Sequence, residues 1–248
     1  MLELLAGGIP MRRALKNTIL ILLILSLTVS TALLTYLYFF ASEDRNLSGQ
    51  WTARLDMSKQ AAVTALGWLQ DIEAVSVPLE ELETHMQGLS VRVELILEPA
   101  GHLQGAFRSN VLPESYDACN RAAYEAFAAV FRGIVAKRLY LAGYRGSTDR
   151  EAVEALVTET FGMSTVDYLM SYGPALLPSL EELQALYGGA GTYKAEEGIL
   201  VRQFDGGADE AREERYIRGD TDLILYGEAD SEGAGFLGKP YRLAYTLR

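Results

Sequence analysis

The longest uninterrupted apolar run of the chain lies near its amino end. Residues Thr18 to Phe40 form 23 consecutive positions without a charged side chain. At the helical rise of about 1.5 Å per residue this run spans roughly 34 Å, which is enough to cross the hydrocarbon core of a bilayer with some tilt. The run therefore predicts a transmembrane helix.

After a polar linker at residues 41–48, the hydrophobic period changes to two. Trp51, Ala53, Leu55 and Met57 alternate with polar or charged positions, which is typical of a strand with one buried face. Apolar residues at helical spacing follow, and then a second stretch in which apolar and polar residues alternate on both sides of a Pro-Ala-Gly turn at residues 99–101. The elements predicted after this first strand are helices at Ser58 to about Glu73 and Pro78–Gln87, and strands at Leu89–Glu98 and Leu103–Phe107.

From Pro113 to about Gly191 the pattern is helical. The first helix, Pro113 to about Leu141, carries one apolar stripe at spacings of three, four or seven residues. Capping-box patterns that begin at Thr148, Ser164 and Ser179 each precede a further apolar stretch, so four consecutive helices are expected. The residues of the stripe are Cys119, Ala123, Phe127, Val130, Ile134 and Leu141.

The remaining residues return to short alternating segments separated by turn sequences. Together with the three earlier strands they bring the number of strands to eight, which suits an up-and-down barrel that is filled by side chains or holds one small ligand. The fold predicted is thus α+β, with an amino-terminal transmembrane helix, an eight-stranded barrel and a helical insertion at about residues 111–190. The last five strands are predicted at Thr192–Ala195, Ile199–Phe204, Glu213–Ile217, Asp222–Tyr226 and Tyr241–Leu247.

Charge divides the chain at the apolar run. The whole chain has a net charge of −11, whereas residues 41–248 hold 19 basic and 32 acidic side chains, a net charge of −13. Such a surface repels phosphate backbones, which argues against nucleic acid as a partner. The predicted organisation is a cytoplasmic segment at residues 1–17, an anchor at 18–40, a linker at 41–48 and one barrel domain at 49–248.

The flanks of the apolar run predict its orientation. Arg12, Arg13 and Lys16 precede it and Glu43 and Asp44 follow it, so the amino terminus is expected in the cytoplasm and the barrel domain outside the cell membrane. A cleaved secretory signal is the competing interpretation, but its apolar region is usually only about 7 to 15 residues long. Whether translation begins at Met1 or Met11 stays open.

Gly49-Gln50-Trp51 opens the first strand, and Arg248 follows the last one. A glycine-x-tryptophan at this position, with a basic residue on the final strand, resembles the lipocalin-like (calycin-type) barrels, in particular the bacterial membrane-anchored proteins that carry a helical insertion. In that family the tryptophan closes one end of the barrel and an arginine from the last strand lies across it. The resemblance implies a structural, barrel-closing role for Gly49, Trp51 and Arg248.

Candidate chemistry is sparse. The single cysteine, Cys119, lies on an apolar stripe, and His85 and His102 are the only histidines. No nucleophile or zinc motif accompanies them, so no catalytic residue, metal ligand or cofactor is predicted and the chain is expected not to be an enzyme. The segment Gly233–Lys239 matches the first seven positions of a phosphate-binding loop. The eighth position requires serine or threonine but is occupied by Pro240, so we interpret the match as a chance resemblance.

Two short motifs that resemble binding sites are better explained by turn or loop structure. Arg218-Gly219-Asp220 resembles an adhesion tripeptide, but glycine and aspartate are also what a tight turn between strands requires. Asp205, Asp209 and Glu210 supply oxygen ligands for calcium without the regular spacing of a calcium loop, so a solvated acidic loop is favoured.

Two functions remain for the part outside the membrane. One is a binding module for a small apolar ligand. The other is a structural or protein-interaction module of the cell envelope that uses the helical insertion. An enclosed apolar cavity would favour the first, and a filled barrel with an exposed apolar helical patch would favour the second.

Overall fold

The computed structural model describes residues 9–36, 47–71, 77–101, 103–206, 211–227 and 241–247. The chain separates into two compact units, Met1–Asn46 and Leu47–Arg248. In the first unit, α1 (Ile9–Tyr36) contains a stretch from Ile19 to Tyr36 that is long and apolar enough to cross a membrane, and the side chains of this stretch are exposed. The helix starts earlier than the predicted Thr18, and residues 37–40 of the apolar run lie outside the described residues.

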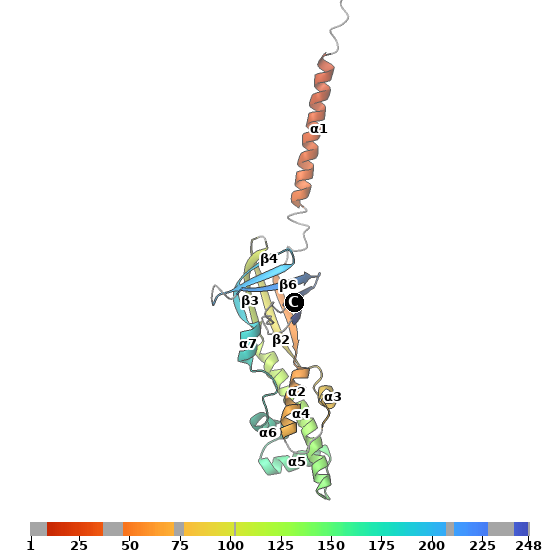
Figure 1. Cartoon of the computed structure of the whole chain (residues 1–248), viewed down its shortest axis with the longest axis vertical. Coiled ribbons are helices and arrows are strands. Elements are labelled where there is room, and N and C mark those ends of the chain that lie inside the picture. Colours follow the sequence, from red (N-terminus) through yellow and green to blue (C-terminus); the bar gives the residue numbers. More distant parts are fainter. Residues whose placement is uncertain are drawn as a thin grey trace, which may run out of the picture. The chain divides into compact units, whose positions relative to one another are not determined.

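Eight strands of the second unit form one closed barrel, as the sequence predicts (Figure 1). Each strand pairs antiparallel with its neighbour along the chain, and β1 closes the sheet by pairing with β8, where Trp51 lies opposite Leu247 and Ala53 opposite Tyr245. The strands are β1 (Gly49–Asp56), β2 (Ser90–Gly101), β3 (Gln104–Val111), β4 (Gly189–Glu196), β5 (Ile199–Phe204), β6 (Ala211–Arg218), β7 (Asp222–Gly227) and β8 (Tyr241–Leu247).

Several strands are longer than predicted. β2 continues through the expected Pro-Ala-Gly turn to Gly101, and β4 already begins at Gly189. A Cβ atom at Gly191 would lie 1.9 Å from the backbone oxygen of Gln203 in β5, so only glycine allows the two strands to approach this closely. Gly189 and Gly191, which the sequence pattern placed in the helical insertion, are therefore part of the sheet.

The helices of the second unit follow β1 and β3 in the chain. Four consecutive helices occupy the predicted insertion, and their first residues agree with two of the three predicted caps, Ser164 and Ser179. The third cap is Asp149 and not Thr148, because the Asp149 carboxylate accepts a hydrogen bond from the Ala152 amide. The helices are α2 (Ser58–Asp71), α3 (Leu79–His85), α4 (Pro113–Leu141), α5 (Arg150–Phe161), α6 (Thr165–Tyr172) and α7 (Leu180–Tyr187).

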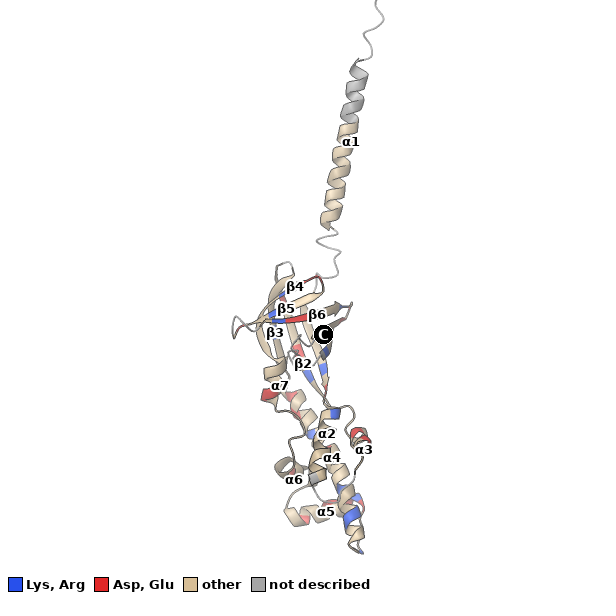
Figure 2. Cartoon of the chain, in the orientation of Figure 1, with Lys and Arg blue, Asp and Glu red and all other residues tan. Residues whose placement is uncertain are grey.

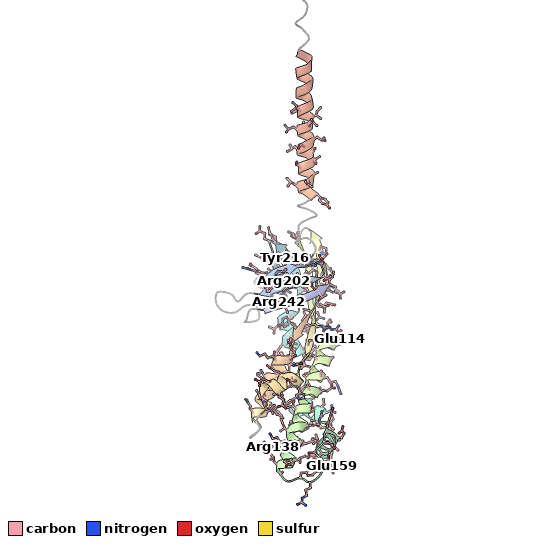
Figure 3. All side chains as sticks on the ribbon, turned by 90° about the vertical axis from the view of Figure 1, so that its right-hand side faces the viewer. Glu114, Arg138, Glu159, Arg202, Tyr216 and Arg242 are labelled. Carbon is pink, nitrogen blue, oxygen red and sulfur yellow. The ribbon has the colours of Figure 1, made fainter. Side chains whose placement is uncertain are left out.

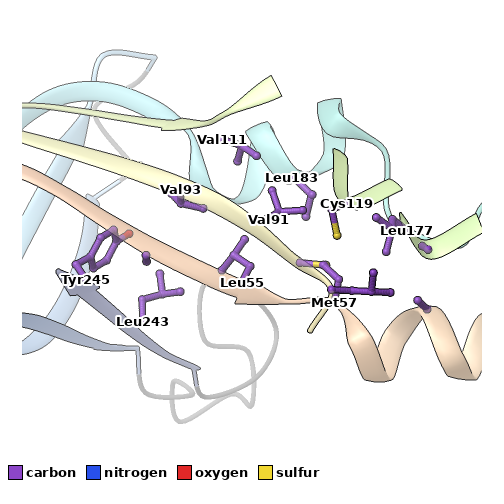
Figure 4. Packing of buried hydrophobic residues seen from close by; sticks show 14 of the residues in the cluster. Leu55, Met57, Val91, Val93, Val111, Cys119, Leu177, Leu183, Leu243 and Tyr245 are labelled. Carbon is purple, nitrogen blue, oxygen red and sulfur yellow. The ribbon is translucent and has the colours of Figure 1, made fainter. Parts of the chain in front are cut away.

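Hydrogen bonds and packing attach the helices to one end of the barrel. The amide of Arg92 in β2 donates to Ser115 Oγ of α4 at 2.9 Å, and the side chain of Gln184 in α7 bonds both backbone groups of Val111 in β3. Buried residues continue without a break from Tyr245 inside the barrel to Leu177 among the helices (Figure 4). The helices thus close this end of the barrel.

The apolar stripe of α4 changes character along its length. Cys119, Ala123 and Phe127 are buried as predicted, whereas Leu141 is 72% exposed. The prediction for Leu141 was wrong because the helix extends past the residues that cover its first half. Its last turns consequently present apolar and basic side chains to solvent.

Candidate functional site

The predicted barrel-closing residues lie where β1 begins. Trp51 is completely buried and its indole N–H donates to the backbone oxygen of Leu47 at 2.8 Å. Gly49 has a φ of +144°, a conformation that favours glycine. The guanidinium carbon of Arg218, at the end of β6, lies 4.7 Å from the centre of the Trp51 ring, and Arg248 lies outside the described residues. An arginine therefore covers the tryptophan, but it is one that the sequence did not single out.

The middle of the barrel holds an ion pair between neighbouring strands. Arg202 of β5 donates from Nε and Nη2 to both carboxylate oxygens of Glu214 in β6, each at 2.7 Å. Their side chains are only 4% and 1% exposed. The Arg202 guanidinium also lies 5.4 Å from the Phe107 ring centre and 5.7 Å from that of Phe204. Figure 3 labels Arg202 among the strands of the barrel.

Tyr245 of β8 lies close to this pair. It is 1% exposed, and burial raises the pKa of its phenol above the ordinary value of 10.0. A neutral tyrosine, a satisfied ion pair and aromatic rings form a polar centre that lacks an accessible nucleophile or base. The geometry of this cluster fits a structural role.

The side chains at the centre of the described barrel are closely packed. A side chain that lines a ligand-sized void keeps accessible surface, yet Val93, Leu95, Leu200, Leu223 and Leu225 have none. The residues predicted to point inward are buried wherever the structure describes their side chains, and that of Tyr241 lies outside the described residues. The buried members of that predicted set are Trp51, Leu55, Met57, Val93, Leu95 and Tyr245.

A second ion pair holds the helices together. Arg132 of α4 donates to Glu154 of α5 at 2.8 Å, and the same carboxylate accepts from the amide and hydroxyl of Thr165 in α6 at 2.9 and 2.8 Å. Burial opposes ionisation of Glu154, but the bonds from Thr165 and Arg132 outweigh it and hold its pKa below the ordinary 4.5. One carboxylate thereby fixes three helices.

Two open grooves lie on the outside of the described structure. A groove of about 360 Å³ runs between α3 and α4, and a broader, shallower one of about 790 Å³ lies beside α7 and the outer surface of β2 and β3. The first is within the size range of small-molecule sites and combines an apolar floor with charged edges. Its lining residues are Val77, Ala129, Val130, Gly133, Ile134 and Leu141, with Glu81, His85, Lys137 and Arg138.

An aromatic cluster reaches the surface on α5 and α6. The Phe161 and Tyr168 rings lie 4.5 Å apart, and Tyr168 and Tyr172 lie 5.3 Å apart. Phe161, Met170 and Tyr172 are exposed, while Tyr168 leads inward to Phe131. We call Phe161, Tyr168 and Tyr172 the aromatic face.

The remaining sequence motifs provide no reactive site within the described residues. Cys119 is buried, and burial raises the pKa of its thiol, so it behaves as a small apolar residue. Arg218-Gly219-Asp220 forms the predicted turn between β6 and β7, in which the Gly219 amide donates to the Asp222 oxygen. His102, Asp209, Glu210 and Gly233–Lys239 lie outside the described residues.

Within the described ranges, no three His, Cys, Asp or Glu side chains come close enough together to hold a metal ion. Comparison of the chain with models of protein families, with curated proteins and with solved structures finds no match.

Sequence patterns did not indicate the two ion pairs or the aromatic face. Arg202 and Glu214 occupy inward positions of predicted strands. Their alternation with less buried neighbours could therefore have indicated that both side chains point into the barrel. Their pairing depends on the register between β5 and β6, which the sequence does not state.

Proposed function

We propose that this chain is a non-enzymatic module anchored in the cell membrane by one helix, with a lipocalin-like barrel as its scaffold and a helical insertion that binds a protein of the cell envelope. The observation that carries the proposal is the contrast between the barrel, whose described central side chains have no accessible surface, and helices that present open surfaces. A ligand carrier needs an accessible cavity, whereas an interaction module needs an exposed apolar patch.

The lipocalin-like assignment is supported by three features. The strands follow an up-and-down order around a closed barrel, a glycine-x-tryptophan opens β1, and an arginine lies over that tryptophan. In this chain the arginine is Arg218 of β6, whereas the family pattern puts it on the last strand. The helices inserted between β3 and β4 match the subgroup with an insertion.

The proposed orientation rests on Arg12, Arg13 and Lys16, which precede the apolar run and keep the amino terminus in the cytoplasm. A cysteine introduced at Lys59, an exposed position of α2, is expected to react with a membrane-impermeant maleimide on intact cells. A cysteine introduced at Lys16 is expected to react only after the cells are opened. The reverse pattern contradicts the orientation.

The aromatic face is the proposed contact with the partner. Exposed aromatic residues that are supported by further rings from below resemble the energetic centres of protein interfaces. A photo-reactive amino acid at Tyr172 in the full chain is expected to crosslink in cells to one partner of defined mass. The matched control is the same amino acid at Ile217, an exposed apolar position on the barrel wall.

The substitution Phe161→Ser is expected to remove the crosslink at Tyr172 and leave the expression level unchanged. Equal crosslinking from Tyr172 and Ile217, or a crosslink that survives the substitution, contradicts the proposed contact.

The second candidate function is binding of a small apolar ligand, which the groove between α3 and α4 favours. Native mass spectrometry of the full chain, released from detergent, tests it directly. An adduct of lipid size that disappears in the variant Ile134→Glu supports this function. An adduct-free spectrum together with a specific crosslink at Tyr172 leaves the protein-interaction function.

A further inference from the structure

The far end of α4 and the loop after it carry an unusual set of exposed side chains. Tyr140 and Leu141 are 74% and 72% exposed, which makes them the most exposed large apolar side chains among the described residues of the second unit. Gly143, with a φ of +80°, ends the helix immediately after them. We call Lys137, Arg138, Tyr140, Leu141, Tyr144 and Arg145 the basic tip.

The basic tip is an exception to the acidic character of the domain. Residues 133–148 contain three basic side chains and no acidic one, whereas residues 41–248 as a whole have a net charge of −13. In Figure 2 the ribbon near the end of α4 carries the blue of Lys and Arg. Lys137 and Arg145 have no ion-pair partner among the described residues.

Two described acidic residues, Asp149 and Glu81, occur beside the basic tip, the first in the sequence and the second across the groove. Asp149 caps α5 and accepts from the Ser147 hydroxyl and the Ala152 amide, and these bonds hold its pKa below the ordinary value. Arg150 follows it directly. Glu81 of α3 lies across the groove from α4, where His85 is also present. Lys137 and Arg145 thus present positive charge to solvent.

We propose that the basic tip docks on the surface of a bilayer that contains anionic lipids. Tyrosine and leucine flanked by lysine and arginine is the composition that settles at a membrane interface, where rings and aliphatic chains enter the head-group region and basic groups reach the lipid phosphates. The apolar side chains stand at a protruding helix end, which suits a soft, deformable surface better than a rigid protein pocket. The remaining acidic surface of the domain limits the contact to this tip.

This surface is separate from the aromatic face, so the inference does not depend on the partner proposed above. Each basic residue near an anionic membrane strengthens binding about fivefold. A tip with three such residues therefore gains roughly 100-fold in binding from its charge, which an excess of vesicles makes measurable.

The test uses the full chain in nanodiscs of phosphatidylcholine, with an environment-sensitive fluorophore at Leu141→Cys. Buried Cys119 is not expected to take up the label. Vesicles with brominated acyl chains and about 30 mol % phosphatidylglycerol are then added, which is enough anionic lipid to attract basic segments. The expected result is a blue shift and quenching at position 141, with no response to vesicles of phosphatidylcholine alone.

The matched control is the fluorophore at Val63→Cys, an exposed apolar position on α2 that is expected to stay unquenched. The variant with Lys137→Glu, Arg138→Glu and Arg145→Glu is expected to lower the partition coefficient at position 141 at least about 100-fold, because three attractive charges become repulsive. Near-ultraviolet circular dichroism establishes that the variant keeps its fold.

Quenching that is equal at positions 63 and 141, that is independent of phosphatidylglycerol, or that survives the charge reversal overturns the proposal. A tip that instead crosslinks to a protein in the same preparation, without quenching by lipid, overturns it as well and assigns the surface to a protein partner.

Discussion

The barrel and the helices each contain one buried arginine paired with a glutamate from another element, and the two pairs differ in how completely they are enclosed. Arg202 and Glu214 share two hydrogen bonds, and almost no part of either side chain reaches solvent. Arg132 makes one bond to Glu154, whose side chain is 32% exposed, and the Nε of Arg132 has no hydrogen-bond partner. The first pair is closed to solvent and shares two hydrogen bonds, whereas the second is partly open to solvent and leaves one donor of its arginine without a partner.

This difference separates a scaffold from a surface that is available for binding. A dry bidentate pair fixes one arrangement of two strands, because breaking it leaves an uncompensated charge in a closed interior. A partly exposed pair tolerates change, since water can replace a lost partner. An open groove lined by Arg132 and Glu154, and the exposed aromatic residues of α5 and α6, occur beside the second pair, which is why we assign binding to the helices.

The largest expected effect is at the pair inside the barrel. Glu214→Ala leaves the buried Arg202 without a partner and is expected to lower the free energy of unfolding by about 3–5 kcal/mol. Urea unfolding of the full chain in detergent, followed by the fluorescence of Trp51 in a Trp68→Phe background, measures the change in the barrel itself. The two tryptophans of the chain make this separation possible.

The double variant Arg202→Met with Glu214→Leu is the matched control, and it is expected to recover most of the loss, because no charge remains buried. A loss below about 1 kcal/mol for Glu214→Ala would mean that water reaches the pair, and the contrast between the two regions would then fail.

A smaller loss is expected where two strands approach closely. Gly191→Ala places a Cβ atom against the Gln203 oxygen, and the strands must separate to accept it. We expect the free energy of unfolding to fall by about 1–3 kcal/mol, the usual range for overpacking a rigid site. Thermal unfolding by circular dichroism measures it, and an unchanged midpoint would contradict the close contact between β4 and β5.

The pair in the helical region is expected to have a moderate effect that depends on pH. Glu154→Gln weakens the bonds to Arg132 and Thr165 and should cost about 1–2 kcal/mol at pH 7. Because the folded pKa of Glu154 lies below 4.5, its stabilisation is present above that value and is lost as the pH falls through the lowered pKa.

The difference between wild type and Glu154→Gln should therefore shrink on acidification from pH 7 to below the pKa of Glu154. Urea unfolding across this range, followed by Trp68 fluorescence in a Trp51→Phe background, measures it. A difference that is constant with pH would show that the carboxylate does not carry this stabilisation.

The smallest expected effect is a gain. Gly67 lies inside α2, and an added Cβ atom would meet nothing within 4 Å. Gly67→Ala is expected to stabilise the chain by up to about 1 kcal/mol, because alanine has the higher helix propensity. Thermal unfolding of this variant beside Gly191→Ala compares glycine in an open helix with glycine in a crowded sheet, and a destabilised Gly67→Ala would contradict the open surroundings.

The local pattern of apolar and polar residues was sufficient to predict most helices and strands of this fold. The period-two alternation from Trp51 to Met57 and the caps at Ser164 and Ser179 correspond to β1, α6 and α7. The predictions were wrong where contacts with a neighbouring element determine the secondary structure or the burial of a residue. Gly189 joins a strand because it pairs with Ser109 of β3, and Leu141 stays exposed because none of the described elements covers the last turn of α4.

The candidate sites were harder to predict than the fold. Trp51 was identified from its position at the start of the first strand, whereas Arg218, which lies over it, comes from a turn 167 residues later in the chain. The aromatic face likewise combines Phe161 with Tyr168 and Tyr172 across two helices. Such groupings depend on how helices and strands pack, and alternation or helical spacing within one element contains no information about it.

The insertion between β3 and β4 also determines the order in which the sheet can be assembled. Ser109 of β3 donates a hydrogen bond to the Tyr187 oxygen just ahead of β4, across a separation of 78 residues, and pairing of the two strands must close a loop of that size. Loops of this length slow the formation of distant contacts, whereas the four helices form from nearby residues. A chain synthesised from its amino end should thus fold the helices against β1–β3 first, so that a completed helical cap acts as the template on which β4–β8 close the barrel.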